Sequence, residues 1–166
     1  AIRVYLTPEE NKVVAVTELE IFGYGNAASN IAQGASLSAS YTCKWDDLNE
    51  INDGVVGYEP AAGNRWSTYN LKGQTHHVQF DFATTYAVNK VVLYPYDDIG
   101  GDNNVHLPQK VELQYYNGSS WVAIPNVTAP AKLLQDTPAE YTFEQLTTSA
   151  IRVYLTPEEN KVVAVT

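Results

Sequence analysis

The sequence predicts an all-β fold, an antiparallel β-sandwich or jelly roll, and three observations support this. Twelve tyrosines stand beside ten glycines and eight prolines, a mixture of aromatic and turn-forming residues that favours strands and turns. About eight short segments alternate apolar and polar residues, and turn formers separate them. No stretch keeps a helical period over three turns. Many short strands joined by turns are typical of a sandwich or jelly roll.

The clearest strand pattern occurs twice. Residues 1–17 and 150–166 are the same segment, AIRVYLTPEENKVVAVT, without a gap. Its first half alternates with a period of two, as a half-buried strand does. The apolar positions of the first copy are Ile2, Val4 and Leu6. A polar break at 8–11 follows, and a second strand is expected over 13–23.

The identity of the two copies has two explanations. Divergent repeats drift in sequence, and this pair has not. We interpret the chain as a circular permutant of a 149-residue unit, engineered so that one segment is kept at both ends. The alternative is a recent tandem duplication in a natural gene. In both cases residues 1–166 are expected to form a single domain, with 18–149 as the rest of the unit.

One folded domain has one place for this segment, and the chain carries two copies. Each apolar side chain of the segment contributes about 1.5–3 kcal/mol when it is fully buried. A spare copy would leave these groups and a strand edge exposed. We therefore expect self-association, by strand exchange or head-to-tail assembly between chains.

The remaining strands follow from alternation and turn signals. They are expected near 31–41, 65–68, 77–82, 88–94, 109–116, 120–124 and 140–144. Residues 25–30 are interpreted as a linker, and 42–63 and 95–108 as long polar loops. Trp66 and Trp121 stand at strand positions and are expected in the core.

Charge and composition restrict the partners. The formal net charge of −9 argues against nucleic acid and anionic membrane, which both need a basic surface. Cys43 is the only cysteine, so no internal disulfide is expected. The chain opens on Ala1, contains no methionine and shows neither a signal peptide nor a membrane-length apolar run. We interpret it as a processed or recombinant fragment.

The acidic residues do not predict catalysis. A glycosidase needs two carboxylates that face each other about 5–10 Å apart. Asp46-Asp47 and Asp97-Asp98 are adjacent pairs, and neighbouring side chains on a strand or tight loop point apart. No nucleophile motif, metal-hydrolase spacing or phosphate loop is present, and Cys43 has no recognisable base partner. We expect a protein that is not an enzyme.

A family resemblance appears when 26–149 is followed by the repeat and then by Glu18–Gly23. The marks that carry it are Ala35–Ser40, Ile51–Gly54, Arg65–Ser67, His77–Phe82, Val88–Val91, Leu107-Pro108, Gly118–Trp121 and Ile151–Leu155. In this order the chain resembles the discoidin-type β-sandwich, also called coagulation factor 5/8 C-domain-like or galactose-binding-domain-like. Within that family it resembles the family-32-like carbohydrate-binding modules of bacterial glycosidases. The Glu-Leu-Glu strand stands first here and last in the family, which supports permutation.

The resemblance implies a non-catalytic carbohydrate-binding module, secreted or periplasmic in its parent protein. It also implies a structural calcium ion, because the family commonly holds one beside its last strand. Carried over by position, Asp53 and Glu18 would supply carboxylates, and Glu50 and Thr17 would supply carbonyl oxygens. The alternative is that Asp53 only stabilises a turn.

The resemblance places a sugar among loops at one end of the sandwich. A sugar is held by an aromatic platform and by planar donors and acceptors. The loops supply these types at Trp45, Asp46, Tyr58, Asn64, Arg65, Tyr96, Asp98, Asn104 and His106. Trp45 lies in a polar loop without apolar neighbours, so it is expected as the exposed platform. The alternative for Asp98, Asn104 and His106 is that they brace their loop.

Two other functions stay open. A lipid- or protein-binding discoidin module would need apolar loop tips, which Trp45, Val55-Val56 and Val105 could supply. A designed self-assembling scaffold would oligomerise without retained ligand binding. The ligand that the resemblance implies is a glycan, for which a galactose- or arabinose-type sugar is one candidate, and the sequence itself does not name the sugar.

Overall fold

The computed structural model describes residues 4, 15–16, 18–25, 27–58, 65–98, 105–135 and 137–166. Over these residues the chain forms strands and two short 3-10 helices, and none of its helices is long and apolar enough to cross a membrane. The strands are β1 (Ala15–Val16), β2 (Leu19–Gly25), β3 (Ala27–Asn30), β4 (Ser36–Ala39), β5 (Trp66–Ser67), β6 (His76–Leu93), β7 (Lys110–Tyr116), β8 (Trp121–Ala123), β9 (Ala139–Thr156) and β10 (Ala164–Val165). The 3-10 helices are η1 (Ala32–Gly34) and η2 (Leu48–Asn52).

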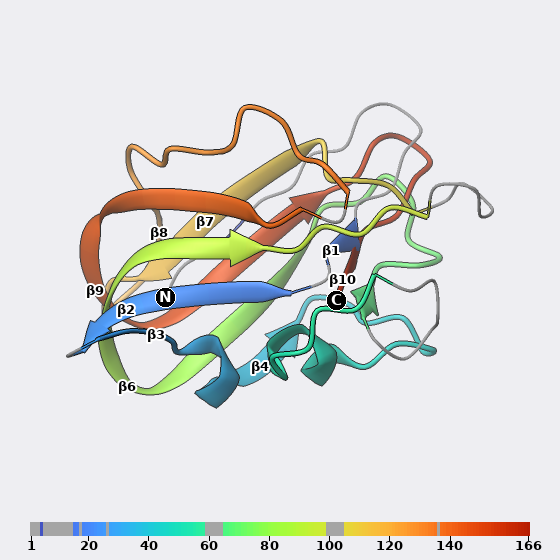
Figure 1. Cartoon of the computed structure of the whole chain (residues 1–166). Helices are drawn as coiled ribbons and strands as arrows, with labels where there is room; N and C mark the ends of the chain where they lie inside the picture. The colour runs from blue at the N-terminus through green and yellow to red at the C-terminus, as the bar shows by residue number, and fades with distance from the viewer. Residues whose placement is uncertain are drawn as a thin grey trace.

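The strands form two sheets, which confirms the predicted antiparallel β-sandwich (Figure 1). The larger sheet has the order β3-β2-β6-β9-β7-β8, and β4 also pairs with β6. All of its pairings are antiparallel. The smaller sheet has the order β1-β10-β5, in which β1 and β10 are parallel. An apolar core from both halves of the chain fills the interior.

Two very long strands organise the larger sheet. The sequence predicts separate strands at 77–82 and 88–94, and the structure joins them into β6 of 18 residues. β9 likewise joins the strand expected at 140–144 to the second copy of the repeat. Their pairing shifts register between Asp81 and Tyr86. Irregularities of this kind bend a strand without ending it, and both strands curve at the same end of the molecule in Figure 1.

The interpretation of residues 25–30 as a linker was wrong. Ala27–Asn30 form β3, which pairs with β2 in a tight hairpin. The side-chain oxygen of Asn30 accepts hydrogen bonds from Ala32 N at 3.0 Å and from Ile21 N at 3.4 Å. Small polar residues have little strand propensity of their own, so only the neighbouring strand β2 makes this segment extended.

The two copies of the repeat lie in different places. In the second copy, Ile151, Val153 and Leu155 are at most 1% exposed, and their strand lies between β6 and β7. In the first copy, Val4 is also buried in the main core. The two copies meet where β1 pairs with β10, and each residue there stands opposite its own equivalent. The second copy therefore holds the central position in the sheet.

One tryptophan prediction is confirmed and one is wrong. Trp66 is fully buried, and its indole N–H donates to Tyr41 O at 2.8 Å and to Thr42 Oγ1 at 3.1 Å. Trp121 is only half-buried, and the Arg152 guanidinium lies 4.0 Å from its ring centroid. β8 ends the sheet, so the side chains of this strand have a neighbouring strand on one side only.

Candidate functional site

Backbone hydrogen bonds join loops that are far apart in the sequence. Cys43 N donates to Ser67 O at 3.1 Å, which connects the loop after β4 to β5. Gly73 N donates to Lys161 O at 2.8 Å, and His106 N donates to Val162 O at 3.5 Å. The sequence predicted that ligand-binding side chains would come from several loops, and these bonds show how such loops are brought together.

Trp45 is exposed, as the sequence predicted. Its side chain is 53% accessible, which is large for a residue of this size. The ring of Tyr69 lies edge-on at a centroid distance of 5.8 Å and an interplanar angle of 74°. The Lys44 ammonium lies 4.3 Å from the Trp45 ring centroid. We call these three residues, Lys44, Trp45 and Tyr69, the rim.

The sequence did not single out Tyr69. It follows a strand of only two residues. A strand this short has no alternating pattern from which the direction of the Tyr69 side chain could be predicted. Its position depends on distant contacts, because the Tyr41 hydroxyl donates to Tyr69 O at 3.0 Å. The next residue, Asn70, has a φ of 79°, which turns the chain immediately after the tyrosine.

Three of the predicted sugar-binding residues contact one another near the rim. The Asp46 carboxylate accepts a hydrogen bond from Ser67 Oγ and lies 3.8 Å from Arg65 Nε. The Arg65 guanidinium lies 4.9 Å from the centroid of the Tyr96 ring. The side chains of Asp46 and Arg65 are only 3% and 14% exposed, and Tyr96 is buried. These residues brace the base of the loops.

His106 and Asp97 lie together on the other side of this brace. Tyr96 packs in a small apolar cluster with Val105 and Val162, whereas the Asp97 carboxylate lies 4.0 Å from His106 Nδ1. The other ring nitrogen of His106 lies 3.4 Å from Lys161 Nζ. Asp98, another predicted site residue, donates its backbone N–H to Val105 O at 3.2 Å. Neighbouring residues of this loop therefore have different contacts: Tyr96 packs in the apolar cluster, and Asp97 lies beside His106.

Tyr58 belongs to a different group of residues. The Tyr94 hydroxyl donates to Glu20 Oε2 at 2.8 Å. Burial raises the pKa of Tyr94, and so do this hydrogen bond and the nearby charges of Glu20, Glu18 and Tyr58. Tyr58 is therefore close to Tyr94 and to a set of acidic residues. The predicted site residues Asn64, Asn104 and Thr17 lie outside the described residues.

Two of the three described residues predicted to bind calcium carry perturbed carboxyl groups. Glu18 is 2% exposed, and burial raises the pKa of its carboxyl to about 7, with smaller contributions from the charges of Glu20 and Asp53. Burial also raises the pKa of Glu50, followed by the charges of Asp53 and Asp47. We call these five residues the acidic cluster.

Asp53 also has the simpler role that the sequence left open. Its Oδ1 accepts the backbone N–H of Val55 at 2.7 Å, as in a turn. Asp47 accepts the N–H of Asn49 at 2.9 Å and so caps η2. Within the described part of the chain, no three His, Cys, Asp or Glu side chains converge closely enough to hold a metal by themselves.

Cys43 is buried against β5. Burial raises the pKa of its thiol, and the nearby Asp46 charge acts in the same direction. A thiol with a raised pKa stays protonated at neutral pH and is a poor nucleophile.

The fold and these loops can be compared with known proteins. The chain has the fold of a solved structure described as belonging to the Streptococcus pneumoniae beta-galactosidase BgaA, with a TM-score of 0.72 and 19% sequence identity. The similarity covers 89% of this chain and 94% of that one. None of the curated proteins matches the chain.

The sequence model of one family matches most of the chain. It covers residues 34–165, which include all but the last residue of the second copy of the repeat and exclude the first copy. Domains of this family are generally binding modules without catalytic activity. The chain belongs to the F5/8 type C, or discoidin, domain family.

Proposed function

We propose that this domain is a non-catalytic carbohydrate-binding module that holds a sugar against the rim. The exposed ring of Trp45, braced edge-on by Tyr69, carries the proposal. A sugar has apolar C–H faces that pack on an indole ring, and an exposed indole gains free energy when water leaves it. The net charge of −9 favours a neutral ligand over an anionic one.

Polar groups beside the rim would orient the sugar. Lys44, which is part of the rim, supplies a donor next to the ring, and the largely buried pair of Asp46 and Arg65 braces the base of the same loops. The structural relative comes from a beta-galactosidase, so a galactose-type sugar is the first ligand to test and an arabinose-type sugar the second. Such a module would act where polysaccharides are found, in a secreted or periplasmic parent protein.

A glycan array with matched variants tests this proposal. Trp45→Ala should lower the affinity at least tenfold, about 1.4 kcal/mol, because it removes the platform. Trp121→Ala is the control, since Trp121 is a half-buried tryptophan on β8, the end strand of the larger sheet, whereas the rim belongs to loops that border β5. If neither the wild-type protein nor the control binds any glycan, the proposal is wrong.

We also propose that the acidic cluster takes part in a calcium site, with the carboxylates of Glu18 and Asp53 and the carbonyl oxygens of Glu50 and Thr17 as ligands. The raised pKa values of the buried Glu18 and the half-buried Glu50 support it, because neighbouring carboxylates that repel one another are stabilised by a cation. Millimolar Ca²⁺ should raise the melting temperature relative to EDTA, and Asp53→Asn, which changes a proposed carboxylate ligand, should reduce the increase. Equal melting temperatures in Ca²⁺ and EDTA would contradict the site.

We further propose that the duplicated segment mediates self-association. The second copy holds the central position, and among the described residues the first copy forms strand pairs with it at β1 and β10. A spare strand that pairs with another chain would form dimers or longer assemblies. Light scattering across a hundredfold concentration range should show a rising mass, and a variant without residues 1–14 should remain monomeric. A constant monomer mass for the full chain would exclude the proposal.

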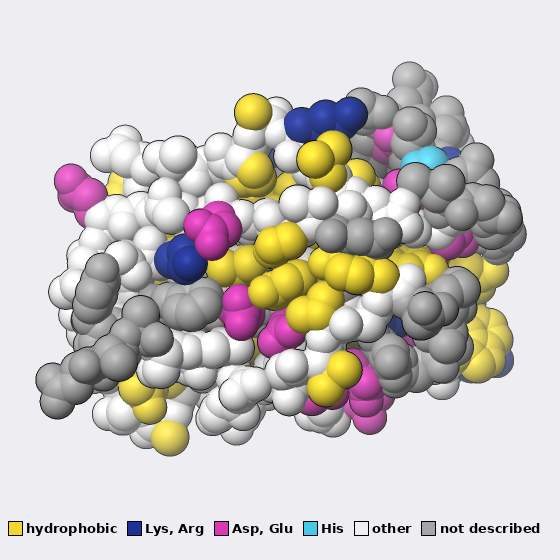
Figure 2. Space-filling view, in the orientation of Figure 1, with side chains coloured by type: hydrophobic (Ala, Val, Ile, Leu, Met, Phe, Trp, Pro, Cys, Tyr) yellow, Lys and Arg dark blue, Asp and Glu magenta, His cyan; other side chains and the backbone are white. Residues whose placement is uncertain are grey.

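A lipid- or protein-binding role is the remaining alternative. Val55 and Val56 are 60% and 38% exposed, as such a module would need. Figure 2 shows a band of hydrophobic side chains across the middle of one face, with acidic side chains beside it. The acidic side chains disfavour an anionic membrane. Binding to neutral or anionic vesicles together with no glycan binding would support this alternative.

A further inference from the structure

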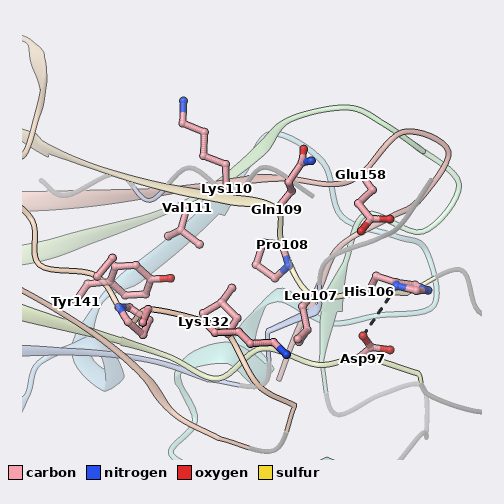
Figure 3. Close-up of a pocket in the computed structure, with 14 residues that line it drawn as sticks. Asp97, His106, Leu107, Pro108, Gln109, Lys110, Val111, Lys132, Tyr141 and Glu158 are labelled. Carbon is pink, nitrogen blue, oxygen red and sulfur yellow. Dashed lines mark ion pairs between the residues drawn. The ribbon is translucent and has the colours of Figure 1, made fainter. Parts of the chain in front are cut away.

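A cavity of about 640 Å³ lies beside the loop that carries Asp97 and His106, and neither the family match nor the sequence assigns it a role. Figure 3 shows it between the start of β7, the loop at 129–133 and the start of β9. The polar side chains that line it are Tyr141, Lys132, Gln109, Lys110, Asp97, His106 and Glu158. We call this cavity the groove.

We propose that the groove is a second saccharide site, separate from the rim, and that it takes a neutral oligosaccharide of about two sugar rings. This proposal rests on the proposed function in one respect: the choice of a saccharide as the class of ligand. None of its lining residues belongs to the rim, and only His106 was among the expected sugar-binding residues, so the groove can fail or succeed on its own.

The floor of the groove is apolar. Leu107, Pro108 and Val111 line it between its two ends, as Figure 3 shows. Pro108 is buried, and Leu107 and Val111 are half-buried, so the floor retains some contact with water. An apolar strip of this kind can accept the C–H face of a sugar ring.

Polar groups are spread along this floor rather than gathered at one point. The Tyr141 hydroxyl points into the space at one end, and Asp97 and His106 lie at the other (Figure 3). Burial raises the pKa of Tyr141, so the phenol keeps its proton and can donate. Lys132 and Gln109 supply further donors, and Gln109 also supplies an acceptor. Sugar hydroxyls both donate and accept, and this mixture matches them.

The charges of the groove favour a neutral ligand. The carboxylates of Asp97 and Glu158 are balanced by Lys110 and Lys132, which also line the groove. The amine of Lys161 lies nearby, 3.4 Å from His106. His106 is held 4.0 Å from Asp97, which fixes the acidic end before any ligand arrives. Strong anions and strong cations would each meet groups of like charge here.

The size of the groove also fits this ligand. Sites for small molecules are typically about 300–1,000 Å³, and a disaccharide belongs to that range of ligand sizes. Asp97 faces the groove, while the preceding residue, Tyr96, contacts Arg65 at the base of the rim loops. One loop therefore borders both sites, on different sides.

Nuclear magnetic resonance titration with lactose and cellobiose tests the groove. Millimolar disaccharide should shift the backbone amide signals of Gln109 and Ala131, which line the groove. These shifts should persist in Trp45→Ala, which removes the rim platform. Lys132→Ala changes an exposed side chain and should weaken binding at the groove at least fivefold, while the amide shifts of Trp45 and Tyr69 stay unchanged. Tyr141→Phe, which keeps the ring and removes only the hydroxyl, should weaken it similarly.

The outcomes separate the two sites. Groove signals that do not shift with either sugar would overturn the proposal, even if the rim signals shift. Groove shifts that vanish in Trp45→Ala would also overturn it, because the sugar would then bind at the rim alone. Groove shifts without rim shifts would support it and count against the proposed role of Trp45.

Discussion

The two copies of the repeat are one sequence in two environments. In the second copy, Ile151, Val153 and Leu155 face the core from a strand paired on both sides. In the first copy, Ala15–Val16 form the end strand of a small sheet. The local pattern makes both copies able to form strands, but it cannot choose between the two positions, because the residues are identical. The neighbours of each copy must make that choice.

The chain that precedes the second copy gives it an advantage. It continues directly from the first half of β9, where Tyr141 already stands opposite Val91 of β6. A strand that extends an existing ladder needs no further loop closure. The first copy instead leads into Glu18, a buried carboxyl whose pKa is raised to about 7. Burying that carboxyl is costly at neutral pH.

The largest expected effect on the free energy of unfolding comes from truncating the equivalent leucine to alanine in each copy. Leu155→Ala should lower the free energy of unfolding by about 2–5 kcal/mol, because the leucine is fully buried. Leu6 lies outside the described residues, and Leu6→Ala, the equivalent change in the first copy, is expected to cost less, because β1 of that copy is an end strand. Urea denaturation measures both. Equal losses would mean that the two copies share the central position.

A second expected effect is a pH dependence of the stability that comes from Glu18, the residue that directly follows the first copy. The pKa of Glu18 is about 7 in the folded state, above the ordinary value of 4.5. The folded protein therefore holds this proton more tightly than the unfolded chain does. Its stability should be greater below about pH 4.5 and should fall by about 2–3 kcal/mol as the pH rises through 7.

Glu18→Gln should flatten this dependence, because glutamine does not titrate. Glu144→Gln is the matched control, since Glu144 is an exposed residue of β9. Chemical denaturation between pH 4.5 and 8 in EDTA measures the slope without a bound cation. A wild-type slope that persists unchanged in Glu18→Gln would contradict the assignment to this residue.

The smallest effect concerns the place where the copies pair. Ala164 is fully buried and stands between Ala15 and Ser67, so Ala164→Pro should cost about 1–3 kcal/mol. Ala15→Pro changes the end strand and should cost less than about 1 kcal/mol. Thermal melting of the two variants tests the order. A larger loss for Ala15→Pro would mean that the first copy is the more important strand.

The candidate site was predictable only in part. Trp45 could be expected at the surface, because a large aromatic residue among polar neighbours has no apolar face to join. Tyr69 could not, since its place against Trp45 depends on a turn and on a hydrogen bond from Tyr41. Tyr58 was grouped with the sugar-binding loops by its residue type, whereas the structure places it near Tyr94 and the acidic cluster.

By itself the sequence determined the fold class and most of the strands, because alternation with a period of two follows from the geometry of one chain. It also revealed the repeat. Only the tertiary structure decided which copy lies in the centre, that residues 27–30 form a strand, and that Trp121 stays half-buried. These outcomes depend on which strands lie alongside, and strand pairing joins residues far apart in the chain that no local pattern specifies.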